Sequence, residues 1–86
     1  MVEKGYNSDL QVGGLSYHVQ TEDWGQQNPF IVSRVFCNGA VVRSVKTAYD
    51  RVLPDVQART ARAIQLAVRY QHEKILDLLV SGQLTR

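Results

Sequence analysis

The stretch PFIVSRVFCNGAVVRSVKT, residues 29–47, decides the fold of this chain. Two runs rich in β-branched and aromatic residues flank the dipeptide Asn38-Gly39. Asn and Gly tolerate the positive φ angles that a two-residue hairpin turn requires, so the pattern predicts a β-hairpin. In this hairpin Phe36 faces Val41, and the pairing continues away from the turn one residue at a time on each strand.

Continuing that pairing gives the hairpin two different faces. One face is small and aliphatic and carries Ile31, Ser33, Val35, Cys37, Ala40, Val42 and Ser44; the other is aromatic, apolar and basic and carries Phe30, Val32, Arg34, Phe36, Val41, Arg43 and Val45. Arg34 is then predicted directly opposite Arg43, and like charges across a ladder destabilise it unless something neutralises them. Three solutions stay open: Glu22 or Asp23 from a neighbouring strand, an anionic ligand, or a protein interface.

Another hairpin is predicted on the N-terminal side. Polar and apolar residues alternate on both sides of Gly13-Gly14, which is the period-two pattern of half-buried strands. Pairing across this turn places Asp9 opposite His18 on a polar face, while the alternate residues form an apolar face.

A long helix is predicted after the hairpins. Pro54 suits its first turn, Asp55 complements its dipole and Gly82 suits its C-terminal cap. Between them, apolar residues recur at helical spacing, namely Ala61, Ile64, Ala67, Val68, Ile75, Leu78 and Leu79. A helix of about 25 residues would be near 38 Å long. That length exceeds what a small sheet covers, so we expect the helix to break or to project toward a partner.

These elements predict an α+β fold, with a four-stranded antiparallel meander of two hairpins followed by one long C-terminal helix packed on one face. The pattern leaves open which face of the 30–47 hairpin the helix covers. The predicted organisation is a single domain of residues 1–86, with a loose N-terminal segment at 1–7, the two hairpins at 8–47 and the helix at 55–81.

The charge of the chain is small overall but segregated. The net charge is +2; residues 1–29 carry one base and four acids, whereas residues 30–53 carry four bases and one acid. Such segregation serves either an anionic partner or internal pairing. One cysteine excludes an internal disulfide, and no apolar run is long enough to span a membrane. Because the N-terminus also has no apolar signal segment, we expect a cytoplasmic protein with no membrane partner.

The heptapeptide YHVQTED, Tyr17 to Asp23, resembles a group of short, uncharacterised bacterial domains with a Y-H-[VI]-Q-T-E-D strand. The other pieces that match this group are Pro29-Phe30-Ile31-Val32, Asn38-Gly39 and Lys46-Thr47. The resemblance implies a bacterial origin and a compact domain, and it transfers no activity and no catalytic residue. The order β-β-β-β-α also resembles that of whirly-type single-strand binders, in topology alone.

The residues that could carry chemistry do not predict an enzyme. His18 lies opposite Asp9, but a metal site needs at least three converging ligands. We therefore expect an Asp9–His18 cross-strand pair and a structural Cys37, because nothing in the sequence marks an activating base beside this thiol. Among the motifs absent are the P-loop, G-x-G-x-x-G, C-x-x-C and G-x-S-x-G. No catalytic residue, metal or cofactor is predicted.

The function expected from these features is a non-enzymatic protein–protein interaction module that self-associates as a homo-oligomer. The predicted interface is either the exposed face carrying Phe30, Val32, Phe36 and Val41 or the long helix, since together they carry more apolar surface than one small core hides. Trp24 interrupts a polar loop, where it either covers an edge of the core or contacts a partner.

The alternative function is a single-stranded nucleic-acid-binding domain. Phe30 and Phe36 would stack on bases while Arg34 and Arg43 hold phosphates. A secondary basic patch is predicted on the helix at Arg59, Arg62 and Arg69.

Overall fold

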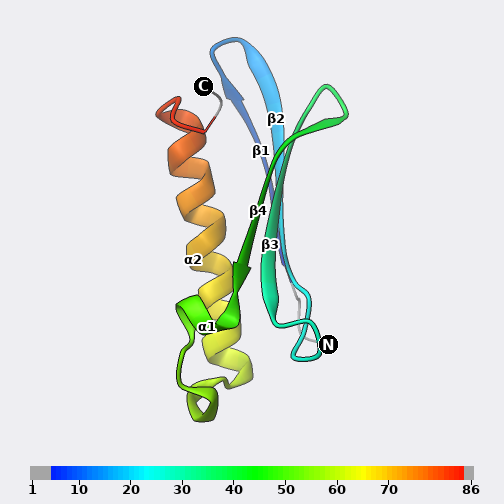
Figure 1. Cartoon of the computed structure of the whole chain (residues 1–86). Coiled ribbons are helices and arrows are strands. Elements are labelled where there is room, and N and C mark those ends of the chain that lie inside the picture. The colour runs from blue at the N-terminus through cyan, green and yellow to red at the C-terminus, as the bar shows by residue number, and fades with distance from the viewer. Residues whose placement is uncertain (1–4, 85–86) are drawn as a thin grey trace.

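The computed structural model describes residues 5–84 and has the predicted α+β architecture (Figure 1). Its elements are β1 (Gly5–Val12), β2 (Leu15–Asp23), β3 (Phe30–Cys37), β4 (Ala40–Ala48), α1 (Tyr49–Val52), the 3-10 turn η1 (Val56–Ala58) and α2 (Ala61–Val80). The strands form one antiparallel sheet in the order β1-β2-β3-β4. Helix α2 lies across β1, β2 and β3 on one face of the sheet, which we call the inner face.

Both hairpin turns form where the sequence predicts them. The two central residues of each turn have positive φ, at 57° and 81° for Gly13 and Gly14 and at 54° and 80° for Asn38 and Gly39. This is the type I′ geometry that matches the twist of the flanking strands. The register of the first hairpin is also as predicted, with Asp9 opposite His18.

The register of the second hairpin departs from the prediction after the first two pairs. A β-bulge interrupts the ladder between Val35 and Phe36 of β3 and adds Val42 as an extra residue on β4. Every later partner therefore moves by one residue, so that Arg34 faces Ser44 and Arg43 faces Val35. The predicted Arg34–Arg43 pair is wrong. Arg43 lies on the inner face with Val35, although the uninterrupted alternation placed it beside Arg34.

The predicted strand and helix limits also change. Strand β1 begins at Gly5, so residues 5–7 of the predicted loose segment are part of the sheet, and residues 1–4 lie outside the described residues. Helix α2 begins at Ala61 and not at residue 55, because Thr60 is its N-cap and accepts a hydrogen bond from the Ala63 amide at 3.1 Å. Asp55 instead caps η1 by accepting from the Gln57 amide at 3.0 Å. The 20 residues of α2 span about 30 Å, which is shorter than the helix of about 38 Å that the sequence predicts.

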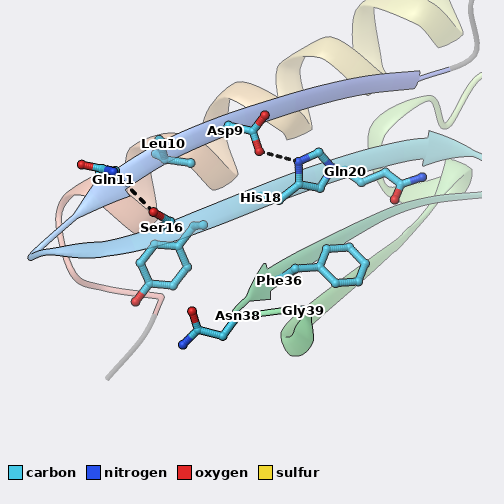
Figure 2. Close-up of a pocket in the computed structure, with 10 residues that line it drawn as sticks. Asp9, Leu10, Gln11, Ser16, His18, Gln20, Phe36, Asn38 and Gly39 are labelled. Atoms are coloured by element: carbon cyan, nitrogen blue, oxygen red, sulfur yellow. Dashed lines mark hydrogen bonds and ion pairs between the residues drawn. The ribbon is translucent and has the colours of Figure 1, made fainter.

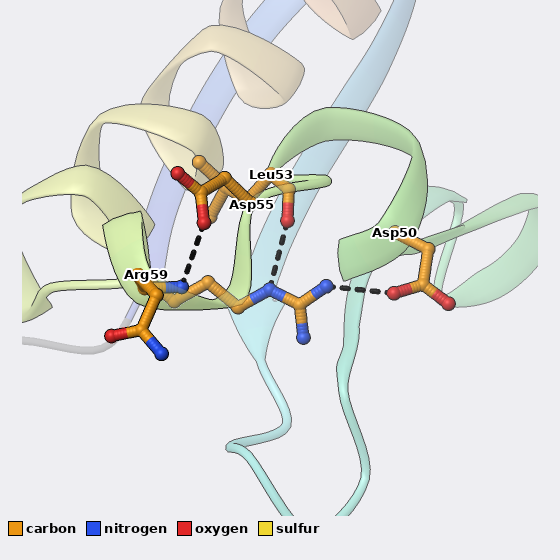
Figure 3. A network of polar contacts seen from close by, with 5 residues as sticks. Asp50, Leu53, Asp55 and Arg59 are labelled. Atoms are coloured by element: carbon orange, nitrogen blue, oxygen red, sulfur yellow. Dashed lines mark hydrogen bonds and ion pairs between the residues drawn. The ribbon is translucent and has the colours of Figure 1, made fainter.

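Arg59 holds the connector between β4 and α2 (Figure 3). Its guanidinium donates to the Leu53 carbonyl at 2.8 Å and to Asp50 Oδ1 at 2.7 Å. The same group lies 5.6 Å from the ring centre of Tyr49, which is buried. Tyr49 donates its hydroxyl to Asp23, and burial followed by this carboxylate raises the pKa of the phenol well above its usual value. These contacts tie the connector to the base of the sheet.

The C-terminal end of α2 closes in a Schellman turn. Gly82 has a φ of 78°, its amide bonds the Leu79 carbonyl, and the Gln83 amide bonds the Leu78 carbonyl at 2.9 Å. This confirms the predicted cap at Gly82. The turn directs Leu84 back into the core, where it is 8% exposed.

The core between α2 and the sheet has two apolar clusters. The first contains Tyr17, Val19, Val35, Ile75, Leu79 and Leu84. The second contains Ile31, Tyr49, Ile64 and Val68. Along α2, the buried residues between Val68 and Ile75 are Gln71 and His72, which are polar. Polar side chains therefore occupy the helix–sheet interface between the clusters.

Candidate functional site

The outer face of the sheet, on the side away from α2, holds the predicted binding residues Phe30, Arg34 and Phe36. Other members from the strands include Asp9, His18, Gln20, Glu22, Val32, Val41, Ser44 and Lys46. Less apolar surface is exposed here than the sequence predicts, because Val32 is buried and both phenylalanines are half-buried. Val41, with half of its surface exposed, is the exception.

The two arginines that the sequence placed together have separate partners on opposite faces of the sheet. Arg34 Nη1 lies 3.4 Å from Glu22 Oε1 across the β2–β3 ladder, which is one of the predicted solutions. Arg43 donates to the Leu84 carbonyl at 3.0 and 3.3 Å, on the inner side of the sheet. Arg34 therefore belongs to the outer face, whereas Arg43 binds the turn that follows α2.

Trp24 joins the outer face from the loop between β2 and β3. The Lys46 ammonium lies 5.1 Å from the centre of the Trp24 ring and 4.2 Å from that of Phe30, and the Arg34 guanidinium lies 5.9 Å from the Trp24 ring. These distances suit cation–π contacts. Trp24 is 39% exposed, so its ring is partly open to solvent while it contacts the two cations.

A shallow groove of about 760 Å³ lies at the opposite end of the outer face, near the hairpin turns (Figure 2). His18 Nδ1 lies 2.8 Å from Asp9 Oδ1, and the His18 and Phe36 ring centres are 5.9 Å apart. The groove is also lined by polar groups that can donate and accept hydrogen bonds, including the amides of Gln11, Gln20 and Asn38. It combines flat rings with hydrogen-bonding groups, and it adjoins the Asp9–His18 pair that the sequence predicts.

The described part of the chain does not assemble a metal centre. Across residues 5–84, no three His, Cys, Asp or Glu side chains are grouped so that they could hold an ion. Cys37 is half-buried and packs against the cluster that contains Tyr17 and Leu79.

The three arginines of the predicted secondary basic patch do not share one environment. Arg59 is held in the connector, where 11% of its side chain is exposed. Arg69 pairs with Glu73 at 2.9 Å, one helical turn along α2. Arg62 is exposed on α2. The three arginines therefore occur in different environments, and two of them have a carboxylate partner.

A buried chain of polar side chains crosses the helix–sheet interface, and sequence reasoning missed it. His72 Nε2 lies 2.8 Å from Ser8 Oγ and its Nδ1 lies 2.8 Å from Thr21 Oγ1. Thr21 Oγ1 lies 2.7 Å from Ser33 Oγ, which accepts from Gln71 Nε2 at 3.0 Å. The chain links β1, β2 and β3 to α2. Its one sequence signal is that two polar residues interrupt the apolar stripe of the helix.

The Gln71 amide sets the direction of this chain. Its nitrogen also donates to the Ile31 carbonyl at 3.3 Å, so it is a donor to Ser33 as well. The protons of Ser33, Thr21 and His72, which are all buried, have an acceptor when Ser33 donates to Thr21 and Thr21 donates to Nδ1 of His72. The imidazole then carries its proton on Nε2 and donates it to Ser8. A second proton on Nδ1 would oppose the hydroxyl of Thr21.

Burial lowers the pKa of His72 below its ordinary 6.5; Glu73 opposes the shift, and His18 adds to it. Because the pKa of His72 is lower in the folded state, the unfolded chain takes up this proton at a higher pH than the folded chain does. Stability is therefore full above about pH 6.5 and declines below it, by up to about 1.4 kcal/mol per pH unit.

We expect denaturant unfolding at a series of pH values to show this decline, and we expect His72→Gln to reduce it. His18→Gln is the matched control, because it removes the other described histidine, whose side chain is 38% exposed, and leaves the buried imidazole in place. His18 is the smallest of the named causes of the shift, so most of the pH dependence should remain in this variant. An unchanged pH dependence in His72→Gln would contradict the assignment.

Strand β4 forms an open edge of the sheet. None of its nine residues is buried, and its largest exposed apolar side chains are Val41 and Val42 at 50% and 51%. In the described part of the chain, β4 pairs with β3 alone. On the exposed surface of α2, Leu66, Tyr70 and Val80 are apolar, but Glu73 and Asp77 lie between them.

No family model, curated protein or solved structure matches this chain. Among residues 5–84, no helix combines the length and the apolar character needed to cross a membrane.

Proposed function

We propose that this chain is a non-enzymatic protein-interaction module that associates with a second copy of itself through the edge of β4. The observation that carries the proposal is the open edge itself, with six exposed and three half-buried residues. An edge strand presents unpaired backbone N–H and C=O groups, which readily pair with another strand. Two copies that pair edge to edge form a symmetric dimer with a continuous sheet.

The charges of β4 do not block such pairing. Basic side chains protect many sheet edges. Here, however, Arg43 is bound to the Leu84 carbonyl on the inner side and Lys46 lies over Trp24 and Phe30 on the outer side. Both cations are engaged within their own chain, on the faces of the sheet.

The bulge and the charge of Lys46 together limit the register of the dimer. Regular pairing cannot extend past Val42, so the two strands pair within residues 43–48. Symmetric pairing centred on Lys46 would place the two ammonium groups opposite each other. Pairing centred on Val45 avoids this, because it places each Lys46 opposite Ser44 of the other copy, on the outer face.

This register makes Ser44 the position at which charge controls association. We expect Ser44→Lys to weaken the dimer and Ser44→Glu to strengthen it, each by about tenfold, because two cross-strand charge pairs of about 0.7 kcal/mol change per dimer. Sedimentation equilibrium or light scattering over a concentration series measures both changes. Pairing limited to residues 43–48 buries little surface area. We therefore expect the unmodified dimer to dissociate on dilution.

Three controls separate this interface from others. Asn7→Lys places the same charge on the opposite edge of the sheet, in β1, and should leave association unchanged. The double variant of Ser44→Glu with Lys46→Gln should lose the tighter dimerisation expected of Ser44→Glu alone. If Leu66→Arg on α2 dissociates the dimer while the Ser44 variants have no effect, the interface is the helix and the β4 proposal is wrong. A strict monomer at high concentration would also contradict it.

A further inference from the structure

We propose that the outer face of the sheet binds single-stranded nucleic acid, with unpaired bases stacking at its two ends and phosphates held between them. This function would be additional to self-association. Pairing through the β4 edge extends the sheet in its own plane, so the outer face of each copy stays open and the two faces become continuous.

The rings on this face occur at two separate places. Phe36 and His18 form a ring pair in the groove near the hairpin turns. Phe30 and Trp24 lie at the other end. Phe36 and Phe30 are six positions apart along β3, or about 20 Å at the rise of a strand. Aromatic side chains on an open sheet face are stacking platforms that accept any base.

The strand positions of the two cations lie between Phe36 and Phe30, and both side chains also reach the Trp24 ring. Arg34 is two residues from Phe36 on β3, and Lys46 is opposite Val32, the next outer-face residue along β3. Within the described chain, no carboxylate forms an ion pair with Lys46, which contacts rings instead. A phosphate between two stacked bases would therefore meet positive charge, and the amides of Gln20 and Asn38 in the groove can hydrogen-bond a base edge.

Two acids oppose a polyanion on the same face. Asp9 is paired with His18, and Glu22 is paired with Arg34 at a relatively long 3.4 Å. Glu22 therefore competes with a phosphate for the Arg34 guanidinium. The competition makes a specific prediction, because removing the Glu22 charge should strengthen binding.

The test is fluorescence anisotropy with a labelled oligothymidylate at several salt concentrations, using the whole chain. We expect binding at low salt, and weaker binding to a duplex of the same length because its bases are already stacked. Phe36→Leu should weaken binding about tenfold. Lys46→Gln should weaken it and make the slope of log affinity against log salt shallower by about 0.7. Glu22→Gln should strengthen binding about threefold.

Matched controls lie on the exposed surface of α2. Tyr70→Leu removes an exposed ring and Arg62→Gln removes an exposed cation, both on the far side of the domain from the outer face. Neither should change the affinity by more than about twofold, and circular dichroism checks that every variant is folded.

Several results would overturn the proposal. These are no binding at low salt, duplex bound as tightly as single strand, equal losses in the outer-face and helix variants, or weaker binding by Glu22→Gln. Ser44→Lys separates this proposal from the dimer, because it should dissociate the dimer while leaving an outer face that still binds the oligonucleotide.

Discussion

Leu79→Ala is expected to lower the free energy of unfolding by about 3–4 kcal/mol, the largest effect of any single substitution considered for this chain. Leu79 is fully buried in the cluster that joins α2 to Tyr17, Val19 and Val35 of the sheet. Truncation removes three buried carbons and leaves a cavity, because the rigid sheet and the helix can close on it only partly.

The size of the domain makes this loss severe. A chain of 86 residues has a total stability of about 4–13 kcal/mol at typical values per residue. Denaturant unfolding followed by circular dichroism measures the change as a lower midpoint at an unchanged slope.

Leu66→Ala is the matched control for the cavity, since it makes the same substitution in the same helix at a residue with 52% exposure. It should change stability by less than about 0.5 kcal/mol. Equal losses at positions 66 and 79 would show that helix propensity, and not packing, sets the effect. An unchanged midpoint in Leu79→Ala would contradict the position of this side chain in the core.

Thr21→Val should lower the free energy of unfolding by about 2–3 kcal/mol, although valine has nearly the same shape and is more apolar. Thr21 is fully buried and lies at the centre of the polar chain, between His72 and Ser33. Without its hydroxyl, the imidazole loses the donor to its Nδ1 and the Ser33 hydroxyl loses its acceptor. Two buried polar groups are then unpaired, and each contributes to the cost.

Three companion variants test this cause. Thr21→Ser keeps the hydroxyl and should lose about 1 kcal/mol for the missing methyl group. Ser16→Ala removes an exposed strand hydroxyl and should have little effect. The double variant of Thr21→Val with Ser33→Ala should lose less than the sum of the single losses, because both break the same chain. If Thr21→Val is as stable as the unmodified chain, the polar chain contributes nothing to stability.

Local chemistry explains why the strands, turns and helix cap could be predicted. Asn38-Gly39 and Gly13-Gly14 favour the type I′ turn through their own backbone preferences, without help from distant residues. The alternating pattern around Gly13-Gly14 fixes the register of the first hairpin once its turn is known. Gly82 caps the helix for the same local reason, since its positive φ costs glycine little.

The start of a helix is difficult to predict from the sequence when two nearby residues both suit it. The prediction began the helix at residue 55, because the preceding proline suits a first turn and Asp55 complements the dipole, but Asp55 and Thr60 are both good N-cap residues. In the fold, Asp55 caps η1 and Thr60 caps α2. Arg59 closes the connector between β4 and α2 through the Leu53 carbonyl and Asp50, and these contacts exist only when the chain has folded back.

The candidate outer-face site was predicted in part. Phe30, Arg34 and Phe36 lie on this face and Trp24 joins it, but Arg43 does not. Val41 and Val42 are the same residue type, so the sequence gives no sign that one of them is the extra residue of a bulge. Lys46 therefore reaches the outer face in place of Arg43, and the arrangement of charge on this face follows from the bulge.

By itself, the sequence determined the features that depend on neighbouring residues: two hairpins, their turns, an amphipathic helix and its C-terminal cap. The tertiary structure alone decided which side of β4 each side chain occupies, and it alone brought the polar chain together. Ser8, Thr21, Ser33 and His72 come from four separate elements. Within its own segment, each of these is an ordinary polar residue. Their hydrogen bonds form only when α2 docks on the sheet and removes these side chains from water.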